Sequence, residues 1–271
     1  MMKQLFGVEK PVIGMVHLLP FPGSGSYGGS IDRVIERAVS DAEALAVGGV
    51  HGILIENAGN SPFLIEENID IIDTAMVTRA AVEIGRNVTL PFGINIASNG
   101  VKQAIAAAKA SGGRFVRATG WVNGYYSSSG FVAPCAAECV RYRKEIDGEE
   151  IEVYADIKVK NGSHSFIQDK TVEEMAQDAA SARAGGVILT GNTTGVKPDV
   201  GEIRRLKSIL KIPVIVGSGT TAENLEELLS CADGFIIGTG FKEHRQMMEP
   251  VLVDKVREFM ELYNRQKEAV G

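Results

Sequence analysis

The feature that most constrains the fold is a repeated alternation between short apolar runs, rich in Val and Ile, and longer segments of helical period. The apolar runs occupy residues 12–18, 52–57, 91–96, 115–119, 152–159, 187–190, 213–217 and 234–238. Repeated strand–helix units build a parallel sheet, and about eight of them close a (β/α)8 barrel. We therefore predict an α/β fold of the TIM barrel type. A doubly wound open sheet is the alternative, but the units show no obvious reversal point.

The expected helices have recognisable ends. Ser30 and Asp199 are suited to cap the helices that follow them, and Thr171 has Glu174 three residues later, as in a capping box. Paired glycines at 48–49, 112–113 and 185–186 stand where a helix should stop and the next strand begin. This regularity favours the barrel, with a last helix at 251–270.

Composition limits the class of protein. A chain of 271 residues that is 45% hydrophobic can form one domain spanning 1–271. Its net charge of -6 gives no basic face, so we predict no binding to nucleic acid. No apolar run approaches the roughly 18 residues of a membrane span, and the first residues lack the apolar core of a signal peptide. Three cysteines are too few for a disulfide framework, so we expect a cytoplasmic protein.

Polar side chains gather where the predicted strands end, and in a barrel these ends form one rim that carries the chemistry. In the run at 152–159, strand alternation puts Asp156 and Lys158 on the face opposite the apolar one. The candidate catalytic residues are His17, Glu56, Arg117, Asp156 and Lys158, and the candidate substrate-positioning residues are Asn57, Asn95, Thr190 and Asn192. Such a set can transfer protons, form a Schiff base or hold a divalent cation. Mg²⁺ stays open as a cofactor.

Each candidate also has a structural interpretation. His17 could be a hydrogen-bonded packing residue, and Arg117 could form a structural ion pair with Glu56. Cys135 and Cys139 lie one helical turn apart, but no second pair accompanies them, so we assign no metal ligands and read them as buried small residues. The segment 125–131 is either a flap over the site or an inert surface loop.

Two similar glycine turns follow the last two predicted strands. In a barrel, backbone N–H groups at these turns can point together and bind a phosphate. The candidate phosphate-binding residues are Gly217, Ser218, Gly219, Gly238, Thr239 and Gly240, to which Thr220 could add a hydroxyl and Lys242 a charge. Two ordinary tight turns are the alternative. We expect a phosphorylated small molecule as the ligand.

The segments VIGMVHLLPFPGS, GILIENAGNSPF, LTGNTTGVKPD and VGSGTTAENL resemble the BtpA/SgcQ family, with the resemblance running from about residue 10 to about residue 262. It implies a ribulose-phosphate-binding type of barrel. Some members are associated with photosystem I biogenesis at membranes, and others with phosphorylated-sugar metabolism. The residues that match the family pattern are His17, Glu56, Asn57, Asn95, Arg117, Asp156, Lys158, Thr190, Gly191, Thr194, Gly195, Gly217, Ser218, Gly219, Gly238 and Lys242.

The sequence departs from the family pattern at several rim positions. Asn60 replaces a usual aspartate, Ser98 and Asn99 stand where an arginine and an aspartate are usual, and Thr119 replaces an asparagine. The usual Lys–His pair appears as KNGSH, with Asn161 after the lysine and His164 displaced. These changes affect the chemistry more than the phosphate turns and suggest another substrate.

Three functions follow. The first is an enzyme, a lyase or isomerase, that acts on a phosphorylated sugar-like substrate by proton-transfer, aldol or isomerase chemistry. The second is a non-catalytic assembly factor for a membrane complex, which rests on the resemblance alone. The third is a module that binds a phosphorylated metabolite without turnover. A homo-oligomer is also open.

Overall fold

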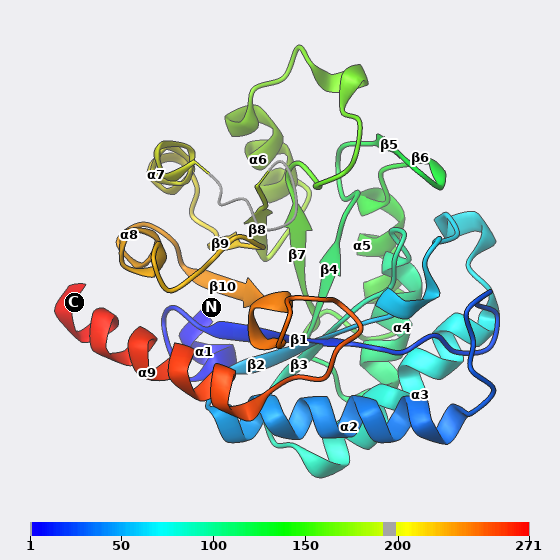
Figure 1. The fold of residues 1–271 in the computed structure, drawn as a ribbon. Helices are drawn as coiled ribbons and strands as arrows, with labels where there is room; N and C mark the ends of the chain where they lie inside the picture. Colours follow the sequence, from blue (N-terminus) through cyan, green and yellow to red (C-terminus); the bar gives the residue numbers. More distant parts are fainter. Residues whose placement is uncertain (1, 192–198, 271) are drawn as a thin grey trace.

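The computed structural model describes residues 2–191 and 199–270 (Figure 1). Eight parallel strands close into a barrel in the order β1-β10-β9-β8-β7-β4-β3-β2. The barrel strands are β1 Val12–His17, β2 Gly52–Glu56, β3 Phe92–Asn95, β4 Phe115–Ala118, β7 Glu152–Asp156, β8 Gly186–Leu189, β9 Val214–Val216 and β10 Gly234–Ile237. The predicted (β/α)8 fold is therefore confirmed, and the open-sheet alternative is excluded.

Helices surround the barrel and connect its strands (Figure 1). They are α1 Met2–Phe6, α2 Ile31–Gly48, α3 Ile71–Asn87, α4 Val101–Ser111, α5 Ala136–Glu145, α6 Val172–Ser181, α7 Val200–Ile209, α8 Leu225–Leu229 and α9 Val253–Val270, with single 3₁₀ turns η1 Ala58–Asn60, η2 Glu66–Asn68, η3 Ser165–Ile167 and η4 Thr239–Phe241. A short antiparallel hairpin, β5 Tyr125–Ser127 and β6 Gly130–Val132, is inserted after β4. It occupies the segment for which we considered a flap.

The expected caps are present. Ser30 accepts a hydrogen bond from the backbone of Arg33, Asp199 accepts one from Gly201, and Thr171 forms a complete capping box with Glu174. Each satisfies backbone N–H groups that a helix start leaves unpaired.

The glycine signals were correct at two helix ends and wrong at the third. Gly49 and Gly112 are left-handed C-caps, with φ of 93° and 84°. After α6, however, the left-handed residue is Arg183, with φ of 64°. Gly185 instead avoids a collision, because a Cβ there would lie 2.1 Å from the Glu152 carboxylate.

Two buried clusters divide the interior. The larger lies between the strands and the helices, and Val153 and Ala155 of β7 belong to it. The smaller cluster fills the inside of the barrel toward the amino-terminal ends of the strands. It contains Ile13, Met15, Leu54, Phe115, Tyr154, Ile188, Ile215 and Ile236. Met2 and Phe6 of α1 pack into the same cluster, so α1 closes the amino-terminal end of the barrel. His17, Asn95 and Asp156, the buried polar residues that end β1, β3 and β7, lie at the opposite, carboxyl end of the barrel.

The alternation of β7 ends with the strand. Tyr154 and Asp156 are buried on the inner face, but the chain bends after Asp156 and Lys158 is exposed. The expectation that Lys158 shares the face of Asp156 is therefore wrong, because strand geometry no longer governs direction at that residue.

Candidate active site at the carboxyl end of the barrel

A cavity of about 630 Å³ opens at the carboxyl ends of the strands. Of the candidates, its lining includes His17, Glu56, Asn95, Arg117, Gly217, Ser218, Gly219, Gly238, Thr239 and Gly240. The structure thus brings His17, Glu56, Arg117 and both glycine turns together around one space.

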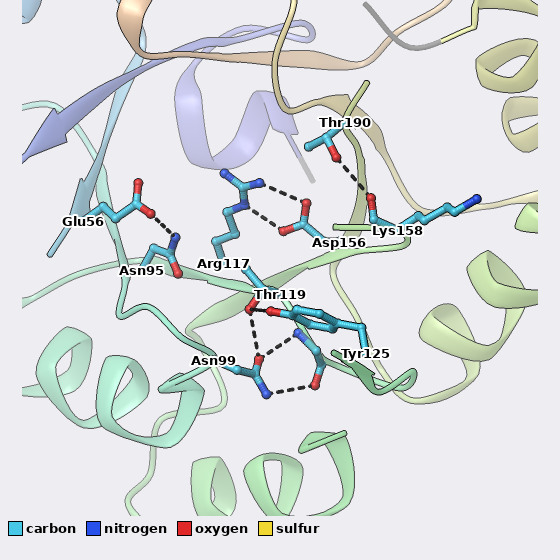
Figure 2. A network of polar contacts seen from close by, with 10 residues as sticks. Glu56, Asn95, Asn99, Arg117, Thr119, Tyr125, Asp156, Lys158 and Thr190 are labelled. Atoms are coloured by element: carbon cyan, nitrogen blue, oxygen red, sulfur yellow. Dashed lines mark hydrogen bonds and ion pairs between the residues drawn. The ribbon is translucent and has the colours of Figure 1, made fainter. Parts of the chain in front are cut away.

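Arg117, which lines the cavity, forms a two-point ion pair with Asp156 (Figure 2). Arg117 Nε donates to Asp156 Oδ2 at 2.8 Å, and Nη2 donates to Oδ1 at 3.0 Å. Burial opposes the charged guanidinium, but the charge and hydrogen bonds of Asp156 outweigh it and raise the pKa of Arg117. Arg117 therefore pairs with Asp156, whereas the structural interpretation had paired it with Glu56.

Glu56 is held from two neighbouring strands. Asn95 Nδ2 donates to its Oε1 at 3.2 Å (Figure 2), and His17 Nε2 lies 3.8 Å from its Oε2. Burial raises the pKa of Glu56, with Arg117 and Lys160 acting in the opposite direction. Glu56 is thus easier to protonate than an ordinary carboxyl group.

His17 is a neutral imidazole in this setting. Burial, followed by the charges of three nearby cations, lowers its pKa to about 3. Its Nδ1 has no hydrogen-bond partner among the described residues. The close approach to Glu56 is therefore a contact between an imidazole and a carboxyl group, and not an ion pair at neutral pH.

Lys160 lines the cavity, whereas Lys158 does not. Figure 2 shows the Lys158 side chain directed away from Asp156, and its backbone carbonyl accepts a hydrogen bond from Thr190 Oγ1 at 3.1 Å. The sequence offered both lysines on one polar face, but only knowledge of where β7 ends distinguishes them.

Tyr125 also belongs to the cavity and was missing from our candidates. Its hydroxyl donates to Thr119 Oγ1 at 3.1 Å, and burial raises its pKa. Asn99 supports this wall, because its Oδ1 accepts from the backbone N–H of Gly120 at 2.7 Å (Figure 2). The family departures Thr119 and Asn99 therefore form one connected hydrogen-bond network, while Ser98 lines the cavity beside it.

The two glycine turns leave backbone donors free. Gly217 N–H bonds to Leu189 and Thr221 N–H bonds to Asn224, but the N–H groups of residues 218–220 have no partner among the described residues. The same holds for residues 239 and 240 at the start of η4. The buried hydroxyl oxygens of Ser218 and Thr220 likewise lack partners there. The buried, unpaired hydroxyls of Ser218 and Thr220 are suited to a ligand that forms hydrogen bonds.

The four glycines of these turns serve different purposes. Gly219 has φ of 77°, which only glycine adopts without strain. At Gly217 a Cβ would lie 2.5 Å from Ile188, and at Gly238 it would lie 2.8 Å from the His17 ring. Gly240 meets only Ile237, at 3.1 Å. Positive φ is thus required at one position, and close packing explains two others.

Other candidates lie outside the cavity. The Asn57 side chain bonds twice to the backbone of Ala97. Its Oδ1 accepts from the Ala97 N–H at 2.7 Å, and its Nδ2 donates to the Ala97 carbonyl at 3.1 Å. Lys242 is fully buried, donates to the carbonyl of Met247, and has its pKa lowered to about 8 by burial. Thr190 bonds to Lys158 as described above. Asn192, like Thr194 and Gly195 of the family pattern, lies outside the described residues.

Two further departures have clear structural settings. Asn60 Oδ1 accepts from Phe21 N–H at 3.1 Å, and its Nδ2 donates to Asp73 Oδ1 at 3.0 Å. Asn161 lines the cavity. His164 is not in the cavity lining; its ring bonds to the carbonyl of Val159 at 3.0 Å and lies tilted against Tyr125, with centroids 5.6 Å apart.

Within residues 2–191 and 199–270, no group of three or more His, Cys, Asp or Glu side chains is arranged to hold a metal ion. Over the same ranges, no helix has the length and apolar character needed to cross a bilayer.

The fold and the site define a (β/α)8 barrel with a charged cavity at the carboxyl ends of its strands. The chain belongs to the BtpA family, whose model matches residues 8–265. It is 35% identical to an uncharacterised protein of Pyrococcus furiosus, over 97% of this chain and 98% of the relative. It is 32% identical to the photosystem I biogenesis protein BtpA of Synechocystis, over 95% and 89%.

Solved structures show the same fold at low sequence identity. Thiamine phosphate pyrophosphorylase from Pyrococcus furiosus aligns with a TM-score of 0.58 at 12% identity, over 95% of this chain and 96% of that one. N-(5'-phosphoribosyl)anthranilate isomerase from the same organism aligns with a TM-score of 0.56 at 17% identity, over 96% and 100%. Both confirm the barrel.

Proposed function

We propose that this BtpA-family protein is an enzyme that binds a phosphorylated, sugar-like small molecule and transfers a proton on it. The carrying observation is that the unpaired donors of both glycine turns share one cavity with the side chains of Glu56 and Arg117, of which Arg117 is paired to Asp156. The residues proposed to bind phosphate and those proposed to transfer the proton thus line the same cavity.

The glycine turns supply the anchor. Free N–H groups at residues 218–220 and 239–240, with the hydroxyls of Ser218 and Thr220, offer hydrogen bonds to a phosphate without any further charge. Two structural neighbours, thiamine phosphate pyrophosphorylase and phosphoribosylanthranilate isomerase, are named for phosphorylated compounds, which supports this choice of ligand.

The charged residues Glu56, Arg117 and Asp156 supply the chemistry in this proposal. Glu56 holds or accepts the proton, because its pKa is raised by burial and His17 and Asn95 fix its position. Arg117 is a fixed positive charge, oriented by Asp156, that stabilises negative charge developing on a substrate oxygen. Proton transfer next to a carbonyl serves both isomerase and lyase reactions. In this account Asp156 orients Arg117, and Lys158 takes no part.

Ligand-induced thermal stabilisation tests the proposal. The protein is heated with inorganic phosphate and with a panel of sugar phosphates, with and without magnesium. A ligand at a hundredfold excess over its dissociation constant stabilises by about 2.7 kcal/mol. Gly219→Ala should abolish the shift, whereas Gly112→Ala, which introduces the same positive-φ strain far from the cavity, should keep it. The absence of a shift with every phosphate would refute the anchor.

A second candidate function is a cytoplasmic assembly factor for a membrane complex. The Synechocystis relative carries the name of a photosystem I biogenesis protein. The supporting observation is a cluster of exposed aromatic rings, Tyr126, Phe131 and Phe166, with centroids 5.3 to 6.2 Å apart beside a groove of about 330 Å³. Membrane co-sedimentation of the wild type and of Phe166→Ser separates this function from the first. Equal recovery in the supernatant for both proteins would exclude it.

A further inference from the structure

Lys160 is a cavity lysine near the charged side chains of the site. It lines the cavity together with Glu56, Arg117 and Tyr125. The other cavity lysine, Lys255, belongs to α9 and donates to the carbonyl of Glu243 at 2.9 Å. No hydrogen bond or ion pair holds the Lys160 ammonium among the described residues. Its amine is therefore free to react.

None of the charged groups described around Lys160 forms an ion pair with it. Four titratable or charged groups act on it or are acted on by it, namely His17, Glu56, Arg117 and Asp156. Both carboxylate oxygens of Asp156 are committed to Arg117. Burial and then the charge of Arg117 lower the pKa of Lys160, while Glu56 and Asp156 act in the opposite direction. The lowered pKa makes the uncharged, nucleophilic amine more accessible than in an exposed lysine.

We propose that Lys160 is a catalytic residue that forms an imine with a carbonyl group of the phosphorylated substrate. The inference rests on the proposed function, because the glycine turns must place the substrate in the cavity. It names the substrate class more narrowly as phosphorylated aldehydes or ketones, and it gives Glu56 the part of the acid in forming the imine.

The step balances without an added reagent. The neutral amine of Lys160 attacks the carbonyl carbon, the C–N bond forms, and the carbonyl π electrons move to oxygen. A proton passes from nitrogen to that oxygen to give a carbinolamine. The Glu56 carboxyl then donates a proton to the hydroxyl, the C–O bond breaks, and water leaves as the iminium forms. Glu56 ends as a carboxylate, able to accept a proton from the adjacent carbon.

Pyridoxal 5′-phosphate is a suitable probe, because it carries both an aldehyde and a phosphate and its imine absorbs visible light. The protein is incubated with the probe, reduced with borohydride and analysed by peptide mass spectrometry. We expect the label mainly on Lys160, with about a tenfold preference for each unit by which its pKa lies below that of an exposed lysine. Inorganic phosphate should compete with labelling.

Matched variants make the result decisive. Lys160→Met should remove the visible band and most of the label, while Lys158→Met, which changes an exposed lysine two residues away, should keep both. Equal labelling of wild type and Lys160→Met would overturn the inference. If phosphate still stabilises Lys160→Met as it does the wild type, the proposed function survives that failure. If phosphate stabilises neither protein, the proposed function fails instead.

Discussion

Arg117 and Asp156 bridge the adjacent strands β4 and β7 through two hydrogen bonds, with side chains that are only 8% and 0% exposed. Removing one partner leaves the other charge buried without compensation. We therefore expect Asp156→Ala to lower the free energy of unfolding by about 3–5 kcal/mol, measured by urea denaturation.

The double variant Arg117→Met/Asp156→Leu serves as the control. Because it removes both charges and fills the space with apolar groups, it should recover most of the lost stability. It should not recover activity, since the positive charge that Arg117 directs at the substrate is then gone. A double variant no more stable than Asp156→Ala would show that the pair is not the source of the effect.

Glu56→Gln should stabilise the protein at neutral pH. Burial raises the folded-state pKa of Glu56 above the ordinary value of 4.5. Its contribution to stability is therefore complete below the unfolded pKa and is lost as the pH rises through the folded pKa. The variant lacks this loss, so its stability advantage over the wild type should grow as the pH rises above 4.5.

Urea denaturation of both proteins from about pH 4 to about pH 8, a range that includes the ordinary carboxyl pKa, measures the effect. Turnover should fall by about 10²–10⁴-fold in the variant, because the proton-transferring group is gone. Stability curves that stay parallel across the pH range would contradict the raised pKa.

Asn60→Asp, which restores the usual family residue, should destabilise this chain. Asn60 donates to the carboxylate of Asp73, which is 8% exposed, so a second carboxylate there would lose the bond and add repulsion. We expect a loss of about 1–3 kcal/mol by thermal or urea denaturation. The exposed Asn264→Asp on α9 is the comparison and should have little effect. Equal stability of Asn60→Asp and wild type would mean that Asp73 is free to move.

The barrel could be predicted from the sequence because local signals agreed with one another. Strand and helix periods, the caps at Ser30, Thr171 and Asp199, and the glycine stops at Gly49 and Gly112 all indicated the same repeated unit. The rim followed from the barrel, since every parallel strand ends at the same side.

The details of the site depend on features that periodicity does not encode. Lys158 and Lys160 were equivalent as long as the strand continued, and only the bend after Asp156 places Lys160 in the cavity and Lys158 outside it. The partner of Arg117 was equally unreadable, because Glu56 and Asp156 both stand at strand ends and the choice depends on side-chain reach across the barrel.

The small helix α1 closes the amino-terminal end of the barrel with Met2 and Phe6. The cavity lies at the opposite end and is lined by residues of the β5–β6 hairpin and of the glycine turns. A substrate and its products would occupy the same described cavity. A cleavage reaction here would release its two fragments one after the other, and the fragment that leaves last would compete directly with the next substrate molecule.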